Sequence, residues 1–99
     1  LEYATYSVAS PEACASIIWR TAEKAPDAAD AMKVSSSELK KINIVDEIIS
    51  EPLGGAHRDY DLISQSIKDS IVSSLSKLSS LSSDDLVKRR YERLLAIGS

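Results

Sequence analysis

Apolar positions at intervals of three and four residues predict one long helix in this chain. Between Tyr60 and Leu78 the large aliphatic residues recur with the period of an α-helix, and Asp59 stands where an N-cap is expected. The apolar stripe consists of Ile63, Ile67, Ile71, Leu75 and Leu78. The opposite face is largely serine, a mediocre helix former, so we expect the helix to depend on packing this stripe against another element.

The stretch SPEACASIIWR carries the start signals of another helix. Ser10 is a good N-cap, Pro11 fits the first helical position, and Glu12 places a negative charge near the positive end of the helix dipole. The apolar spacing that follows predicts a helix from about Pro11 to about Glu23.

Three more helices follow from local signals. A proline-led, alanine-rich stretch predicts a short helix over residues 26–32, and Ser35 with Glu38 has the spacing of a capping box. A last amphipathic helix is expected to begin at Ser82 or Ser83 and to end before Gly98.

Two runs predict short strands. Tyr3 to Val8 alternates in the strand manner, and residues 43–50 are rich in β-branched side chains. Two short strands cannot form a free-standing sheet, so we expect them to be edge pieces of a larger one. The fold class expected is therefore α/β, and the start at Leu1 in strand-like sequence suggests that an N-terminal part is missing.

Composition excludes several classes of protein. Ninety-nine residues make one domain at most, and a net charge of −3 gives no general attraction to nucleic acid or anionic membranes. Cys14 is the single cysteine, which rules out an internal disulfide and a cysteine-based zinc site, and we expect it in the core. No apolar run approaches the roughly 20 residues of a membrane span, and no targeting segment is visible.

The loop Gly54–Arg58 is the best candidate for chemistry. His57 is the chain's single histidine, a residue type suited to acid–base chemistry, and Arg58 could pair with a phosphate or carboxylate. The alternative is a structural or solvent-facing loop. No nucleotide-binding glycine pattern is present, and no Ser-His-acid set can be chosen among so many serines.

Two helix ends offer further candidates. The N–H groups after Ser10 could hold a carbonyl or carboxylate, and Glu12 could act as an acid or base, or could simply favour the dipole. The last helix carries a basic cluster, which is either a solvated face or a contact with a protein or phosphate. The cluster consists of Lys88, Arg89, Arg90 and Arg93.

Four stretches together point to a family. YATYSVASPEACASIIWR, KAPDAADAMKV, INIVDEIISEPLGGAHRD and DLVKRRYERLLAIG occur in this order from Tyr3 to Gly98. They resemble the C-terminal part of the carboxyltransferase alpha subunit of multi-subunit acetyl-CoA carboxylase. The resemblance implies the C-terminal, mostly helical portion of a crotonase-like (ClpP/crotonase) fold with one or two short strands. Residues 1–99 would then be the C-terminal part of a single carboxyltransferase-type domain.

The resemblance also implies an activity and its partners. Members of the family move a carboxyl group from carboxybiotin on a biotin carboxyl carrier protein to acetyl-CoA, giving malonyl-CoA for fatty acid biosynthesis. They pair with a beta subunit, and contacts between alpha subunits are expected. Biotin and acetyl-CoA would be substrates of the complex, with no group bound covalently to this chain, no metal and no membrane. The expected location is the cytoplasm, or the plastid stroma in an alga or plant.

On this resemblance the substrate-binding candidates are Ser10, Glu12, His57 and Arg58, and none is assigned a catalytic role. The family's glycine-rich oxyanion stretch lies upstream of the region present, so this chain alone is expected to be inactive. Many members have glycine where this chain has Ala13, a mild change. A non-catalytic helical module for subunit assembly is the alternative. A relative of enoyl-CoA hydratase is a second alternative. Such an enzyme would need its own pair of oxyanion-stabilising glycines and a second glutamate.

Overall fold

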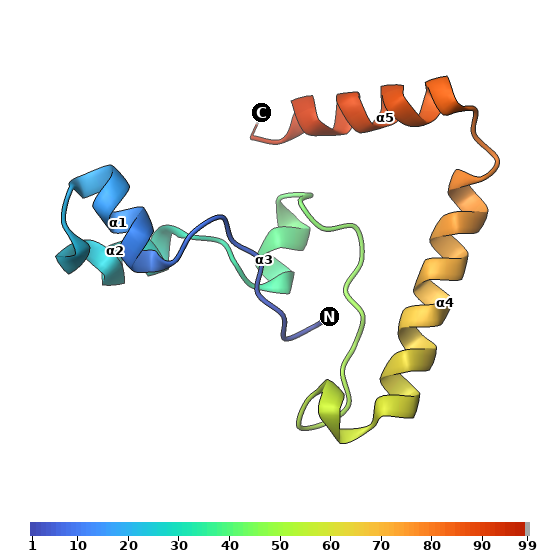
Figure 1. Cartoon of the computed structure of the whole chain (residues 1–99), viewed down its shortest axis with the longest axis horizontal. Coiled ribbons are helices and arrows are strands. Elements are labelled where there is room, and N and C mark those ends of the chain that lie inside the picture. The colour runs from blue at the N-terminus through green and yellow to red at the C-terminus, as the bar shows by residue number, and fades with distance from the viewer. Residues whose placement is uncertain (99) are drawn as a thin grey trace.

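Helices make up almost all of the regular structure (Figure 1). The computed structural model describes residues 1–98. The α-helices of this part are α1 (Pro11–Trp19), α2 (Ala25–Ala31), α3 (Ser36–Lys41), α4 (Tyr60–Leu78) and α5 (Ser83–Ala96). Two short 3₁₀-helices, η1 (Ala22–Lys24) and η2 (Ala56–Arg58), lie between them.

Helix α1 begins as predicted and ends earlier than expected. The Ser10 hydroxyl accepts a hydrogen bond from the Ala13 N–H at 3.1 Å. Arg20 adopts a left-handed conformation with φ of 60°, which ends the helix after Trp19 rather than near Glu23. The chain then turns back through η1, so that α2 packs against α1.

Small side chains allow α1 and α2 to approach closely. Ala15 of α1 and Ala28 of α2 are both fully buried. Cys14, expected in the core, is only half-buried. The buried hydrophobic residues are Ala15, Ala28, Leu39 and Ile63.

Neither predicted strand forms, and this corrects the expected α/β class with one or two short strands. Between residues 1 and 98 the only β-type pairing is an isolated antiparallel bridge of Thr5 with Ser35, beside a bond from the Tyr6 N–H to the Val34 carbonyl at 3.0 Å. The segments 3–8 and 43–50 run as irregular chain. A strand needs a neighbour for its N–H and C=O groups, and these segments have no second strand alongside them.

Helix α3 follows the predicted Ser35–Glu38 signal. The Ser35 hydroxyl donates to the Glu38 carboxylate at 2.8 Å. This bond is the main cause that lowers the pKa of Glu38, and the nearby Lys33 and Lys41 contribute to the same shift. The Ser35 side chain does not also cap the helix backbone, so the capping box is incomplete.

The two C-terminal helices match their predicted bounds. Asp59 caps α4 by accepting from the Leu62 N–H at 3.0 Å, and the helix spans Tyr60–Leu78 as expected. Ser82 caps α5 by accepting from the Asp85 N–H at 3.2 Å. Both predictions are confirmed.

The buried face of α4 differs from the predicted isoleucine stripe. Ile63 is buried, but Ile71 is 53% exposed. Ser70 is half-buried and donates to the Glu47 carboxylate at 2.6 Å, because segment 43–50 runs along this side of α4 (Figure 1). Each step of four residues turns the helix about 40° past a full circle, so the apolar series drifts away from the contact face. The prediction holds only at the start of the helix.

Helix α4 stands beside segment 43–50, and α5 runs back from the end of α4 toward the side of the molecule on which α3 lies; we call these two helices the α4–α5 arm (Figure 1). The radius of gyration is 17.2 Å. A compact chain of this length has a radius of gyration of about 13 Å. In the part of the chain described, no helix has the length and apolarity needed to cross a membrane.

Candidate functional site

The start of α1 presents two of the candidate residues. Ser10 is occupied as the helix cap, and Glu12 is exposed in the first turn. Within residues 1–98, Glu12 makes no ion pair or side-chain hydrogen bond. Its position is explained by the helix dipole, and its carboxylate remains available to solvent or to a ligand.

The turn before η2 requires both of its glycines. Gly54 has φ of 91°, and Gly55 has φ of 112° with ψ of 169°, a region that only glycine readily occupies. A Cβ on Gly54 would lie 3.1 Å from Cγ of Arg58, and one on Gly55 would lie 3.1 Å from Nδ1 of His57. The side chains of His57 and Arg58 therefore fold back over the turn.

Two carboxylates that the sequence reasoning missed hold this turn in place. The Glu51 carboxylate accepts from the Ala56 N–H at 2.9 Å and from the Tyr3 N–H at 2.6 Å. The Glu2 carboxylate accepts from the Glu51 N–H at 3.0 Å. The N-terminal segment and the turn are thus joined through Glu2 and Glu51. In the sequence, the only local signal for this role is that an acidic residue directly precedes the Pro-x-Gly-Gly turn.

The four candidates do not form one pocket. Ser10 and Glu12 belong to the start of α1, whereas His57 and Arg58 belong to η2, and Figure 1 places these elements in different parts of the molecule. Both η2 side chains are exposed. Each pair therefore remains a separate candidate.

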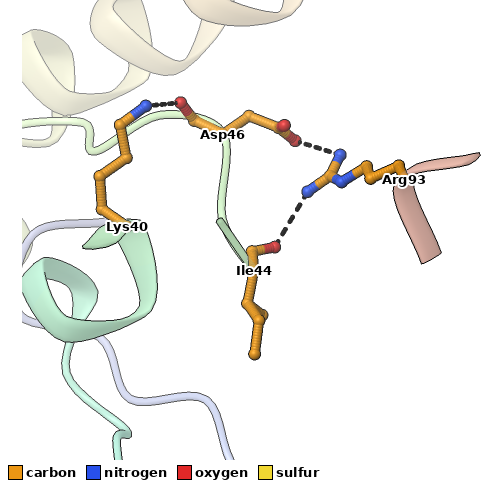
Figure 2. A network of polar contacts seen from close by, with 4 residues as sticks. All are labelled: Lys40, Ile44, Asp46 and Arg93. Atoms are coloured by element: carbon orange, nitrogen blue, oxygen red, sulfur yellow. Dashed lines mark hydrogen bonds and ion pairs between the residues drawn. The ribbon is translucent and has the colours of Figure 1, made fainter. Parts of the chain in front are cut away.

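One residue of the basic cluster ties the α4–α5 arm to the rest of the chain (Figure 2). Arg93 of α5 donates to the Asp46 carboxylate at 2.8 Å and to the Ile44 carbonyl at 3.0 Å. Lys40 donates to the backbone carbonyl of Asp46. Arg93 therefore serves a structural contact across two segments far apart in the sequence, which no local signal could have shown.

The other arginines line a hollow between α5 and the segment near Ile44. Its volume is about 850 Å³, and its lining combines aliphatic side chains with Arg89 and Arg90 and with the carboxylates of Asp46 and Glu92. Neither arginine forms an ion pair with a carboxylate of residues 1–98. The same residues include no cluster of His, Cys, Asp and Glu able to hold a metal ion. Because carboxylates and arginines both line the hollow, its charge does not favour an anionic ligand.

Comparison with known proteins covers the whole described chain. Residues 1–98 match the family described as acetyl co-enzyme A carboxylase carboxyltransferase-like. The relative from Photorhabdus laumondii subsp. laumondii, an acetyl-coenzyme A carboxylase carboxyl transferase subunit alpha, is 56% identical over 98 residues. Proteins of the same name from Pseudomonas putida and Photobacterium profundum are 55% and 53% identical over 98 residues.

The match has the same extent in each of these relatives. It includes 99% of this chain and 31% of the relative. The chain therefore spans about a third of the length of the curated relatives it matches. Because the family match extends over residues 1–98, the chain belongs to the acetyl co-enzyme A carboxylase carboxyltransferase-like family.

Proposed function

We propose that this chain is part of the carboxyltransferase of acetyl-CoA carboxylase. The complex would move a carboxyl group from carboxybiotin on a carrier protein to acetyl-CoA and so form malonyl-CoA for fatty acid biosynthesis. The observation that carries this proposal is the 56% identity over 98 residues to a subunit named for this activity. Identity of this level over nearly the whole chain supports a shared role.

The proposal includes an assembly. The relatives are named subunit alpha, which supports a beta subunit as partner, with the biotin carboxyl carrier protein and a second alpha subunit as further contacts. We propose that these helices belong to a crotonase-like carboxyltransferase domain. The bacterial relatives support a cytoplasmic location. Biotin and acetyl-CoA act as substrates, and neither is attached to this chain.

In the proposed reaction a bond forms between the methyl carbon of acetyl-CoA and the transferred carboxyl carbon, while the bond from that carbon to the biotin nitrogen breaks. The biotin nitrogen accepts the proton that the methyl group loses. This chain can contribute positive potential toward anionic parts of the substrates. The N–H groups at the start of α1 and the guanidinium of Arg58 are the candidates for that contact.

A second candidate function is a non-catalytic module for subunit assembly. The observation that favours it is the separation of the four candidate residues between α1 and η2, together with the extended α4–α5 arm. In that case the chain would be needed for the complex to form, and its own polar side chains would not affect the chemistry.

A chimera tests the proposed function. We would replace the 98 matched residues of the Photorhabdus alpha subunit with this chain, add the beta subunit, carboxylated biotin carrier protein and acetyl-CoA, and assay malonyl-CoA formation. We expect activity within about tenfold of the natural complex, a change in barrier below about 1.4 kcal/mol. The 99-residue chain alone should be inactive, since missing oxyanion donors are worth about 10²–10³ each. A correctly assembled but inactive chimera would contradict the proposed function.

Glu12→Gln in the same chimera should lower kcat/KM by less than about tenfold. Glutamine keeps the size of the side chain and loses only the charge–dipole interaction, about 0.3–1 kcal/mol. The control is Glu23→Gln, another exposed acid in a first helical turn. A general acid or base contributes about 10²–10⁴-fold. A loss beyond about a hundredfold, with one limb of the pH profile removed, would show that Glu12 is catalytic.

A further inference from the structure

The Glu51 carboxylate has a backbone donor on each of its oxygens. One oxygen accepts from the Ala56 N–H at 2.9 Å, and the other accepts from the Tyr3 N–H at 2.6 Å. Glu51 is half-buried, whereas His57 and Arg58 of the same turn are exposed. Because hydrogen bonds to an ionised carboxylate are stronger than neutral ones, Glu51 holds the turn and the N-terminal segment at a fixed spacing.

We propose that Glu51 is a positioning residue, which acts through Arg58 and determines where this guanidinium meets an anionic group of the substrates. The inference rests on the proposed function, in which Arg58 is a candidate for that contact. Glu51 itself takes part in no chemical step.

The link from Glu51 to Arg58 runs through the backbone of the turn. Ala56, whose N–H Glu51 holds, is the first residue of η2. The Arg58 N–H donates to the Gly55 carbonyl at 3.1 Å. The Arg58 side chain lies back over Gly54, where an added Cβ would stand 3.2 Å from Nε. Holding the Ala56 N–H therefore fixes the turn from which the guanidinium projects.

The N-terminal segment that Glu51 contacts is itself anchored. The Glu2 N–H donates to the Ile49 carbonyl at 2.9 Å, and the Glu2 carboxylate accepts from the Glu51 N–H at 3.0 Å. The Ser36 hydroxyl of α3 donates to the Glu2 carbonyl at 2.5 Å. The position of the turn is thus set by segment 1–3 and α3 as well as by its own residues.

The guanidinium of Arg58 is available to a ligand. Among residues 1–98, Arg58 forms no ion pair with a carboxylate. A guanidinium presents its N–H donors in a rigid planar fork, so its orientation decides how well it binds a carboxylate or phosphate. A displaced turn would weaken that contact.

Kinetics of the chimeric complex test the role of Glu51, with KM measured separately for acetyl-CoA and for the carboxylated carrier protein. Glu51→Gln leaves one acceptor oxygen for two donors, so one of the two bonds is lost. We expect one KM to rise about three- to tenfold, the effect of one hydrogen bond. The change in kcat should be smaller, because a contact equal in ground and transition states affects KM alone. The KM that rises distinguishes the phosphates of coenzyme A from the carboxyl group of carboxybiotin.

Glu2→Gln is the matched control. The Glu2 carboxylate accepts one bond, from the Glu51 N–H, and the amide oxygen of glutamine can still accept it. Both KM values should therefore stay within about twofold of those of the unmodified chimera, well below the effect of losing one hydrogen bond.

A double-mutant cycle tests whether Glu51 acts through Arg58. Arg58→Gln should raise the same KM, and the double variant should be no worse than the more severe single variant, since the two residues serve one contact. If Glu51→Gln prevents assembly of the complex, Glu51→Asp takes its place in the cycle, because aspartate keeps both acceptor oxygens on a shorter side chain.

A second measurement requires no activity. In the 99-residue chain, Glu51→Ala removes both bonds and should speed amide hydrogen exchange at Ala56 by about tenfold. The NMR signal of Arg58 Nε should also shift. Glu2→Gln should change neither.

Several results would overturn the inference. In an active chimera these are unchanged KM values in Glu51→Gln, unchanged KM values in Arg58→Gln, or effects of the two that multiply in the double variant. Unchanged exchange at Ala56 in Glu51→Ala would overturn it as well. An inactive unmodified chimera would contradict the proposed function, and the exchange measurement would still decide whether Glu51 holds the turn.

Discussion

Ile63→Ala should destabilise the chain by about 2–5 kcal/mol, the range found for removing a large aliphatic side chain from a packed site. Ile63 is 5% exposed and is the only buried residue of α4. It lies in the first turns of the helix, just after the Asp59 cap, so its loss should also free the start of α4. Urea unfolding followed by circular dichroism measures the change in the free energy of unfolding.

Ile71→Ala is the matched control, because it removes the same atoms from the same helix. Ile71 is 53% exposed, and we expect a change within about 0.5 kcal/mol in the isolated chain. Amide hydrogen exchange along α4 should show faster exchange at its start in Ile63→Ala only. Equal destabilisation by the two substitutions would mean that the isoleucine stripe predicted from the sequence is buried in solution, rather than the face of α4 that the structure shows buried.

Gly55→Ala should cost about 1–3 kcal/mol, the usual strain of a non-glycine residue in a sparsely populated backbone region. Gly55 has φ of 112° and ψ of 169°, and an added Cβ would lie 3.1 Å from the His57 ring. The substitution therefore has two effects, backbone strain and displacement of His57. Thermal unfolding reports the first, and the NMR signals of the His57 ring report the second.

Gly98→Ala separates these two effects. Gly98 also has positive φ, at 81°, but an added Cβ there would meet no neighbouring atom. We expect a smaller loss of stability and unchanged His57 signals. If Gly55→Ala leaves both the unfolding temperature and the His57 ring unchanged, then the turn adopts another conformation in solution, and the Glu51 contact with Ala56 does not define it.

The helices that the sequence predicted correctly are those specified by neighbouring residues. Asp59 and Ser82 cap the helices that follow them, and the helical period after each extends to the observed end. Ser10 likewise begins α1 where expected. A cap hydrogen bond joins residues three apart, so the pattern of residues is sufficient to locate it.

The errors concern features that depend on distant parts of the chain. The two strands were predicted from propensity, but a strand forms only where another strand satisfies its backbone. Which side of α4 is buried depends on where segment 43–50 lies, and this leaves Ser70 half-buried and Ile71 exposed. Cys14 was placed in the core for its apolar neighbours, and the small core of the chain leaves it half-buried.

The candidate site shows the same division. His57 and Arg58 could be chosen from the sequence because a glycine-rich loop with a titratable residue is a local pattern. The partners of the turn, Glu51 and Glu2, could not be chosen, because the bond between them joins residues 49 positions apart. The contact of Arg93 with Asp46 spans 47 positions and was missed for the same reason.

By itself the sequence determined the helix starts, the bounds of α4 and α5, and the family, whose four stretches lie in a fixed order along the chain. Only the tertiary structure decided the early end of α1, the buried face of α4 and the two contacts made through Glu51 and Arg93. The physical reason is the distance along the sequence over which each interaction acts. Caps and helical periods act between residues three or four apart, whereas burial and ion pairing depend on which distant segments the folded chain brings together.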